Sequence, residues 1–151
     1  LINKQMKRLL FLTIFTASLF DTFAQYNASM IGFTNETITL RCTGYGKNAS
    51  KASNDAEISA IKSLLFHGIP NSKYRIAFIQ GNQAIIEQDN KPFFENFYKS
   101  EYKNFIEETV IATPFDKNEN KQKCITLDIE IKASNLKSYL EKQGLIRKFG
   151  L

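Results

Sequence analysis

Strict alternation of apolar and polar residues over 122–132 constrains the fold of this chain more than any other feature. Every second position is apolar: Ile125, Leu127, Ile129 and Ile131. Successive side chains of a β-strand point to opposite faces, so this stretch predicts a strand with one buried face and one wet face. Such strands are typical of antiparallel sheets. Residues 36–45 alternate in the same way and predict a second strand.

Helical spacing replaces alternation between these strands. Residues 49–67 carry a stripe of alanines, which predicts a helix that lies close to a neighbouring surface. Residues 82–107 predict a second helical region with a break near Pro92. A last helix is predicted to begin with Ser134 as its cap and to stop at Gly144.

The predicted fold class follows from the order of these elements. A strand at 109–115 and the strand at 122–132 flank a polar loop, as in a hairpin. The order is then β-α-α-β-β-α, which predicts an α+β fold in which helices pack on a three-stranded antiparallel sheet. Residues 25–35 are polar and are predicted to form a disordered lead-in. The single domain therefore spans 36–151.

The start of the chain has the features of a secretory signal peptide over 6–24. Lys7 and Arg8 precede an apolar run of twelve residues, and small residues lead to a cleavage site after Ala24. The run is shorter than the roughly 20 residues that a transmembrane helix needs. A buried N-terminal helix is the alternative. Residues 1–5 lie upstream, and no later stretch predicts a membrane span.

Composition limits the partners of the exported chain. About 127 residues remain after cleavage, enough for one ordinary domain. The formal charge falls from +5 to +3 when the leader is removed, which is too weak and diffuse to predict nucleic-acid binding. The two cysteines, Cys42 and Cys124, fall on opposite faces of their predicted strands. That arrangement disfavours a disulfide between them, because the Cβ vectors of a disulfide must converge.

No catalytic, cofactor-binding or metal site is predicted. His67 is the only histidine and falls at the end of a predicted helix, where a cation suits the helix dipole. One histidine and two opposed cysteines do not form the usual zinc ligand set. Gly44 and Gly46 lack the spacing of a phosphate-binding loop, so a tight turn explains them better. No cofactor is therefore expected.

One face of the second helical region is aromatic and supplies the candidate binding residues. Packing against the sheet is the first interpretation, because aromatic side chains bury large areas. The alternative is that some rings stay exposed and bind a partner. The candidate partner-binding residues are Phe93, Phe94, Phe97, Tyr98 and Tyr102.

Several short motifs together resemble a group of small uncharacterised exported proteins of Bacteroidota-type bacteria. The motifs are Gly44-Tyr45-Gly46, the run 64–70, the aromatic pattern over 93–106 and the ending over 144–150. The core is also distantly similar to domains of periplasmic flagellar-assembly proteins and of small outer-membrane lipoproteins. The resemblance implies a place in the periplasm or at the outer-membrane periphery, and it implies no activity. This chain lacks the lipid-bearing cysteine of the lipoproteins.

These features predict an exported envelope protein and favour a binding or assembly module over an enzyme. The expected partner is another envelope protein, and the oligomeric state is left open. A hydrolase with an unrecognised site is one alternative, and a purely structural envelope component is another.

Overall fold

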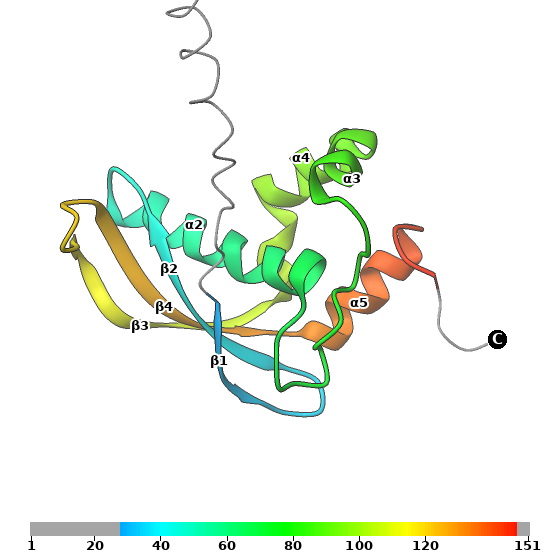
Figure 1. Ribbon diagram of the computed structural model, residues 1–151, viewed down its shortest axis with the longest axis horizontal. Helices are drawn as coiled ribbons and strands as arrows, with labels where there is room; N and C mark the ends of the chain where they lie inside the picture. The colour runs from blue at the N-terminus through cyan, green and yellow to red at the C-terminus, as the bar shows by residue number, and fades with distance from the viewer. Residues whose placement is uncertain (1–27, 148–151) are drawn as a thin grey trace, which may run out of the picture.

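A computed structural model describes residues 28–147 of the chain and shows an α+β fold (Figure 1). The predicted leader and residues 25–27 lie outside the described residues. The elements in chain order are β1 (Ser29–Phe33), β2 (Ile38–Tyr45), α2 (Ala49–Lys62), the π-helix η1 (Ser63–His67), α3 (Gln83–Asp89), α4 (Lys91–Lys99), the 3-10 helix η2 (Glu101–Phe105), β3 (Ile106–Lys117), β4 (Lys123–Ile131) and α5 (Ala133–Lys142).

The sheet is antiparallel and has four strands in the order β1-β2-β4-β3. The prediction of three strands is therefore wrong, and so is the predicted element order. The additional strand, β1, comes from the polar stretch that was predicted to be a lead-in. Met30 of β1 pairs with Leu40 of β2, so contact with an amphipathic neighbour orders a segment that has weak strand character of its own.

The helical predictions hold in outline and differ at their breaks. Residues 49–67 form α2 and η1, which end at Gly68 with a φ of 74°. The second helical region divides into α3, α4 and η2. The region breaks at Asn90, and Pro92 lies in the first turn of α4. N–H groups in the first turn have no acceptor within the helix, so the missing N–H of proline costs no hydrogen bond there.

The predicted cap of the last helix is wrong. α5 begins at Ala133, one residue before Ser134, and no side chain caps it. The Ser134 hydroxyl instead lies 3.2 Å from the hydroxyl of Tyr74, in the loop that joins η1 to α3. Tertiary contact therefore determines the role of this serine.

α2 covers one face of the sheet and packs on its two central strands (Figure 1). Ala52, Ala56 and Ala60 are fully buried, because their small side chains let the helix backbone come close to β2. An added Cβ atom at Gly44 would lie 2.1 Å from the carbonyl oxygen of Ala52. The glycine at this position and the alanine stripe are thus two halves of one close contact.

Candidate functional site

The aromatic residues of α4 and η2 point mainly into the core. Phe94, Phe97 and Tyr102 are buried, whereas Phe93 and Tyr98 are half-buried. The rings of Phe93 and Phe97 stack with centroids 5.5 Å apart, a separation at which aromatic pairs attract. The structure supports a packing role for the buried rings. A partner-binding role for the group stays a prediction.

Tyrosine hydroxyls beside this cluster donate hydrogen bonds to carboxylates. Tyr102 donates to Glu57 at 3.0 Å, and Tyr139 donates to Glu101 at 2.5 Å. Burial and the neighbouring carboxylate raise the pKa of both phenols, that of Tyr139 to about 12. Both phenols stay protonated at neutral pH and act as donors that join α2, η2 and α5.

The three side chains considered as reactive groups, those of His67, Cys42 and Cys124, do not lie together in one site. His67 lies exposed at the end of η1. Cys42 is buried on the face that α2 covers, and burial raises the pKa of its thiol to about 12. Cys124 pairs with Tyr45 on the other face. The prediction that the two thiols lie on opposite faces is confirmed, and both are free.

Two further site types are not found in the part of the chain that the structure describes. Between residues 28 and 147, no group of three or more His, Cys, Asp or Glu side chains could hold a metal ion. None of the helices in this range has the length and apolar character that crossing a membrane requires.

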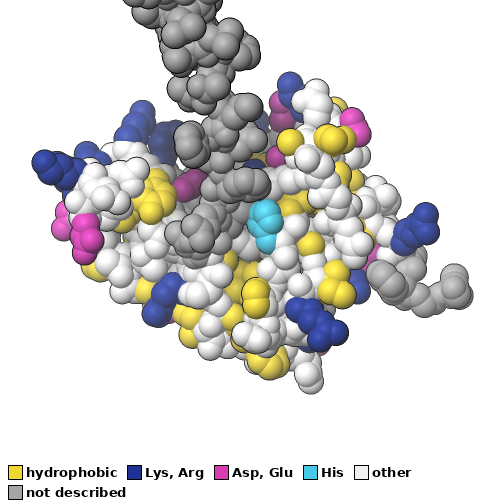
Figure 2. Space-filling view, in the orientation of Figure 1, with side chains coloured by type: hydrophobic (Ala, Val, Ile, Leu, Met, Phe, Trp, Pro, Cys, Tyr) yellow, Lys and Arg dark blue, Asp and Glu magenta, His cyan; other side chains and the backbone are white. Residues whose placement is uncertain are grey.

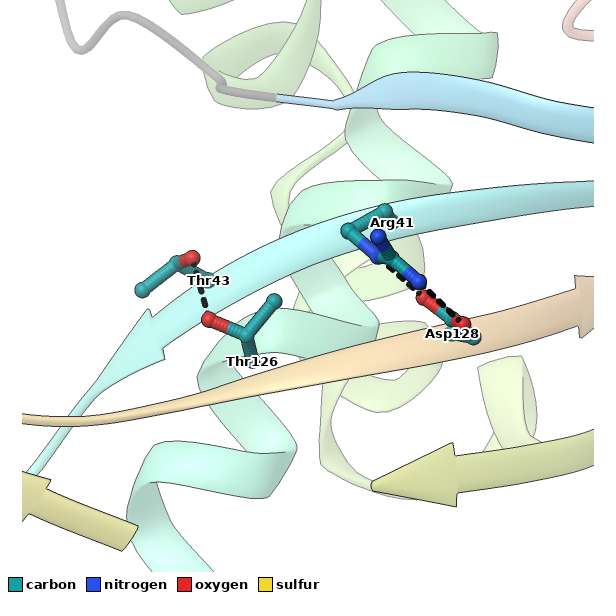
Figure 3. A network of polar contacts seen from close by, with 4 residues as sticks. All are labelled: Arg41, Thr43, Thr126 and Asp128. Atoms are coloured by element: carbon teal, nitrogen blue, oxygen red, sulfur yellow. Dashed lines mark hydrogen bonds and ion pairs between the residues drawn. The ribbon is translucent and has the colours of Figure 1, made fainter. Parts of the chain in front are cut away.

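The open face of the sheet carries a ladder of polar pairs (Figure 3). The Arg41 guanidinium donates two hydrogen bonds to Asp128, from Nε at 2.7 Å and from Nη2 at 2.8 Å. Two residues away on each strand, the hydroxyls of Thr43 and Thr126 lie 2.8 Å apart. The bond from Arg41 holds the pKa of Asp128 below its usual value. Because these side chains satisfy one another, the centre of this face is a closed polar network.

A polar hollow of about 570 Å³ lies at one end of the same face. Four of its eight lining residues have side chains that are engaged with one another. Thr37 donates to Glu130 at 2.7 Å, and the Lys132 ammonium lies 3.2 Å from Glu107. The polar groups at these four positions are therefore already engaged with one another.

The free edge at β3 is the longest exposed element of the sheet. β3 has twelve residues, and among the described strands it pairs with β4 alone. Val110 is 50% exposed and Ile111 is 60% exposed. Glu108 to Ile111 keep an unbroken register with β4, whereas the pairing is irregular before and after this stretch.

A second exposed feature is a groove between the loop over 69–81 and α5. Figure 1 shows this loop descending beside α5 toward the turn between β1 and β2. The cavity has a volume of about 960 Å³ and a lining that is more apolar than polar. Figure 2 shows apolar side chains reaching the surface in small groups on this view of the molecule, with basic side chains among them. This feature is called the loop–α5 groove below.

Comparison of the chain with protein-family models, with curated proteins and with solved structures gives no match.

Sequence reasoning missed both exposed features. For β3 a signal was present, because Pro114 lacks an N–H and proline within a strand is confined to sheet edges and bulges. For the loop–α5 groove there was none. Its two walls are about sixty residues apart in the sequence, and only the fold brings them together.

Proposed function

We propose that this chain is an exported, non-enzymatic module of the bacterial envelope that binds another envelope protein along strand β3. The observation that carries the proposal is the free edge itself. An edge strand presents unpaired N–H and C=O groups that can pair with an extended segment of another chain.

The regular part of β3 is the part suited to such pairing. Proteins commonly protect their edges with proline and bulges, and the second half of β3 has Pro114 and two irregularities of register. The stretch from Glu108 to Ile111 has neither. Exposed Val110 and Ile111 lie on its two faces, since they pair with Asp128 and Leu127. A partner strand added here gains an apolar contact on each face.

Photocrosslinking in the envelope tests this surface. A photoreactive phenylalanine analogue replaces Val110 in one variant and Lys99, an exposed residue of α4, in the control. Adducts with another envelope protein are expected at position 110 only. Ile111→Lys adds a charge to the edge and should abolish the adduct, while stability changes by no more than about 0.5 kcal/mol, as for exposed sites.

Four results would count against the proposal. Equal adducts at both positions, or none at position 110, would remove β3 as the binding surface. An adduct of twice the chain mass would assign β3 to a second copy of this chain. N-terminal sequencing of the same material is expected to begin at Gln25, and an intact leader would contradict export by this route.

A further inference from the structure

The loop–α5 groove has two walls that are fixed in place. In the loop, Phe78 and Ile79 donate backbone hydrogen bonds to the carbonyls of Leu64 and Leu65 in η1, at 3.1 and 2.8 Å. These bonds hold the loop although it contains no helix or strand. The hydroxyl of Tyr74 meets the start of α5 at Ser134, so the loop and the helix touch at this point. A preformed surface loses less entropy on binding than one that must be ordered.

The walls expose apolar side chains to the groove. Ile76 is 60% exposed on the loop, and Phe78, Leu145 and Ile146 are half-buried around it. An isolated exposed isoleucine needs no explanation, but one that lines a concave surface with three other apolar side chains favours binding. The occupant must therefore carry apolar groups.

The charged side chains of the groove favour an occupant of negative charge. Among the described residues that line it, Lys73, Lys137 and Arg147 are basic and Glu141 is the one carboxylate. The cations are spread along its length. Lys73 precedes Tyr74, which contacts the start of α5. Lys137 lies one turn into α5, and Arg147 follows the end of the helix. An anionic partner of similar length is complementary to this distribution.

The spacing of the cations favours a peptide over a single lipid headgroup. The ten residues of α5 extend over about 15 Å, which about five extended residues span. One headgroup could meet one cation, whereas a peptide that alternates acidic and apolar residues could meet all three and place its apolar side chains on Ile76 and Phe78. We propose that the loop–α5 groove is a second binding surface that takes an extended acidic and apolar segment of a protein partner.

Fluorescence anisotropy with the purified full chain tests this proposal. The probe is a labelled peptide of about eight residues in which Glu alternates with Leu, and peptides with Lys for Glu or Ser for Leu are the controls. We expect the first peptide to bind and both controls to bind at least about tenfold more weakly, since each loses one of the two contacts.

Matched variants locate the site. Lys137→Glu and Ile76→Ser should each weaken the Glu-Leu peptide about tenfold. Lys99→Glu and Ile85→Ser are the controls, because Lys99 is an exposed lysine at the end of α4 and Ile85 is 60% exposed, as Ile76 is. These two substitutions should leave the affinity unchanged. All four changes lie at or near the surface, and circular dichroism reports whether each variant is folded.

The outcomes separate this proposal from its rivals and from the β3 proposal. Absence of peptide binding, or equal weakening by the control variants, would overturn it. Binding to anionic phosphatidylglycerol vesicles without binding to the peptide would also overturn it and would assign the groove to lipid. Self-association abolished by Lys137→Glu would assign it to a second copy. Ile111→Lys should leave peptide binding intact, so failure of one surface does not imply failure of the other.

Discussion

Replacing Gly44 by alanine should destabilise the fold severely although it adds only one methyl group. The new Cβ atom would lie 2.1 Å from the Ala52 carbonyl oxygen and 2.3 Å from the backbone nitrogen of Ala56. Both contacts are with helix backbone, which cannot rotate away as a side chain can. Ordinary contact begins near 3.4 Å, so α2 must move by about 1.3 Å relative to β2.

Such a movement disturbs the fully buried alanine stripe and Ile61 beside it. Overpacking of a core costs about 1–3 kcal/mol, and the rigid neighbours place this case at or above about 3 kcal/mol. For a domain of this size that corresponds to a fall in Tm of roughly 10 °C. The control is Gly32→Ala on β1, because a Cβ atom there meets nothing within 4 Å.

Urea denaturation followed by circular dichroism measures both variants. Gly32→Ala should lie within about 0.5 kcal/mol of the parent chain, as at other surface positions. If Gly44→Ala were equally harmless, the close approach of α2 to β2 would not exist as described. A parallel loss in both variants would point to a general cost of alanine in these strands instead.

Three further predictions concern the core and the open face. Only Cys124 should react quickly with a thiol reagent in the native protein, because the thiol of Cys42 is buried and its pKa is raised to about 12; rapid reaction of both would contradict the burial. Since Arg41 lowers the pKa of Asp128 in the fold, the stabilisation by this pair is present above the ordinary value of 3.8 and is lost as the pH falls through the folded pKa. The difference in unfolding free energy between the parent chain and Arg41→Ala should therefore shrink in acid, and a constant difference would exclude the linkage. Phe97→Ala should cost about 3–5 kcal/mol in urea denaturation, whereas a small cost would mean that the ring is not a core residue.

The parts of the fold that were predictable are those in which one face of an element is buried along its whole length. The sequence of β4 alternates because, from Ile125 to Ile131, buried side chains alternate with half-buried ones on the opposite face. α2 shows its contact face as a stripe of alanines. In both cases the burial of one element leaves a period in the sequence, which is what sequence reasoning can detect.

β1 and the edge position of β3 were not predictable from periodicity. Burial alternates along β1, but Ile31 and Phe33 are exposed while Gly32 is half-buried. Residue polarity therefore does not follow burial in so short a strand. Nearly all of β3 is exposed, so its sequence is not under pressure to alternate. The loop–α5 groove depends on tertiary contact between distant segments, for which a single sequence carries no periodic signal.

The exposure of β3 follows from the way in which the helical layer is built. Within residues 28–147, α2 makes the main helical contact with the sheet, and its alanine stripe places it directly on β2 and β4. Because α2 lies so close to these two strands, it does not extend over β3 at the edge of the sheet. Ile111 and Leu127 are cross-strand partners, yet Leu127 is 1% exposed and Ile111 is 60% exposed. The contact that seals the centre of the sheet therefore leaves its edge open. We infer that the stability of the core and the availability of β3 share one structural cause.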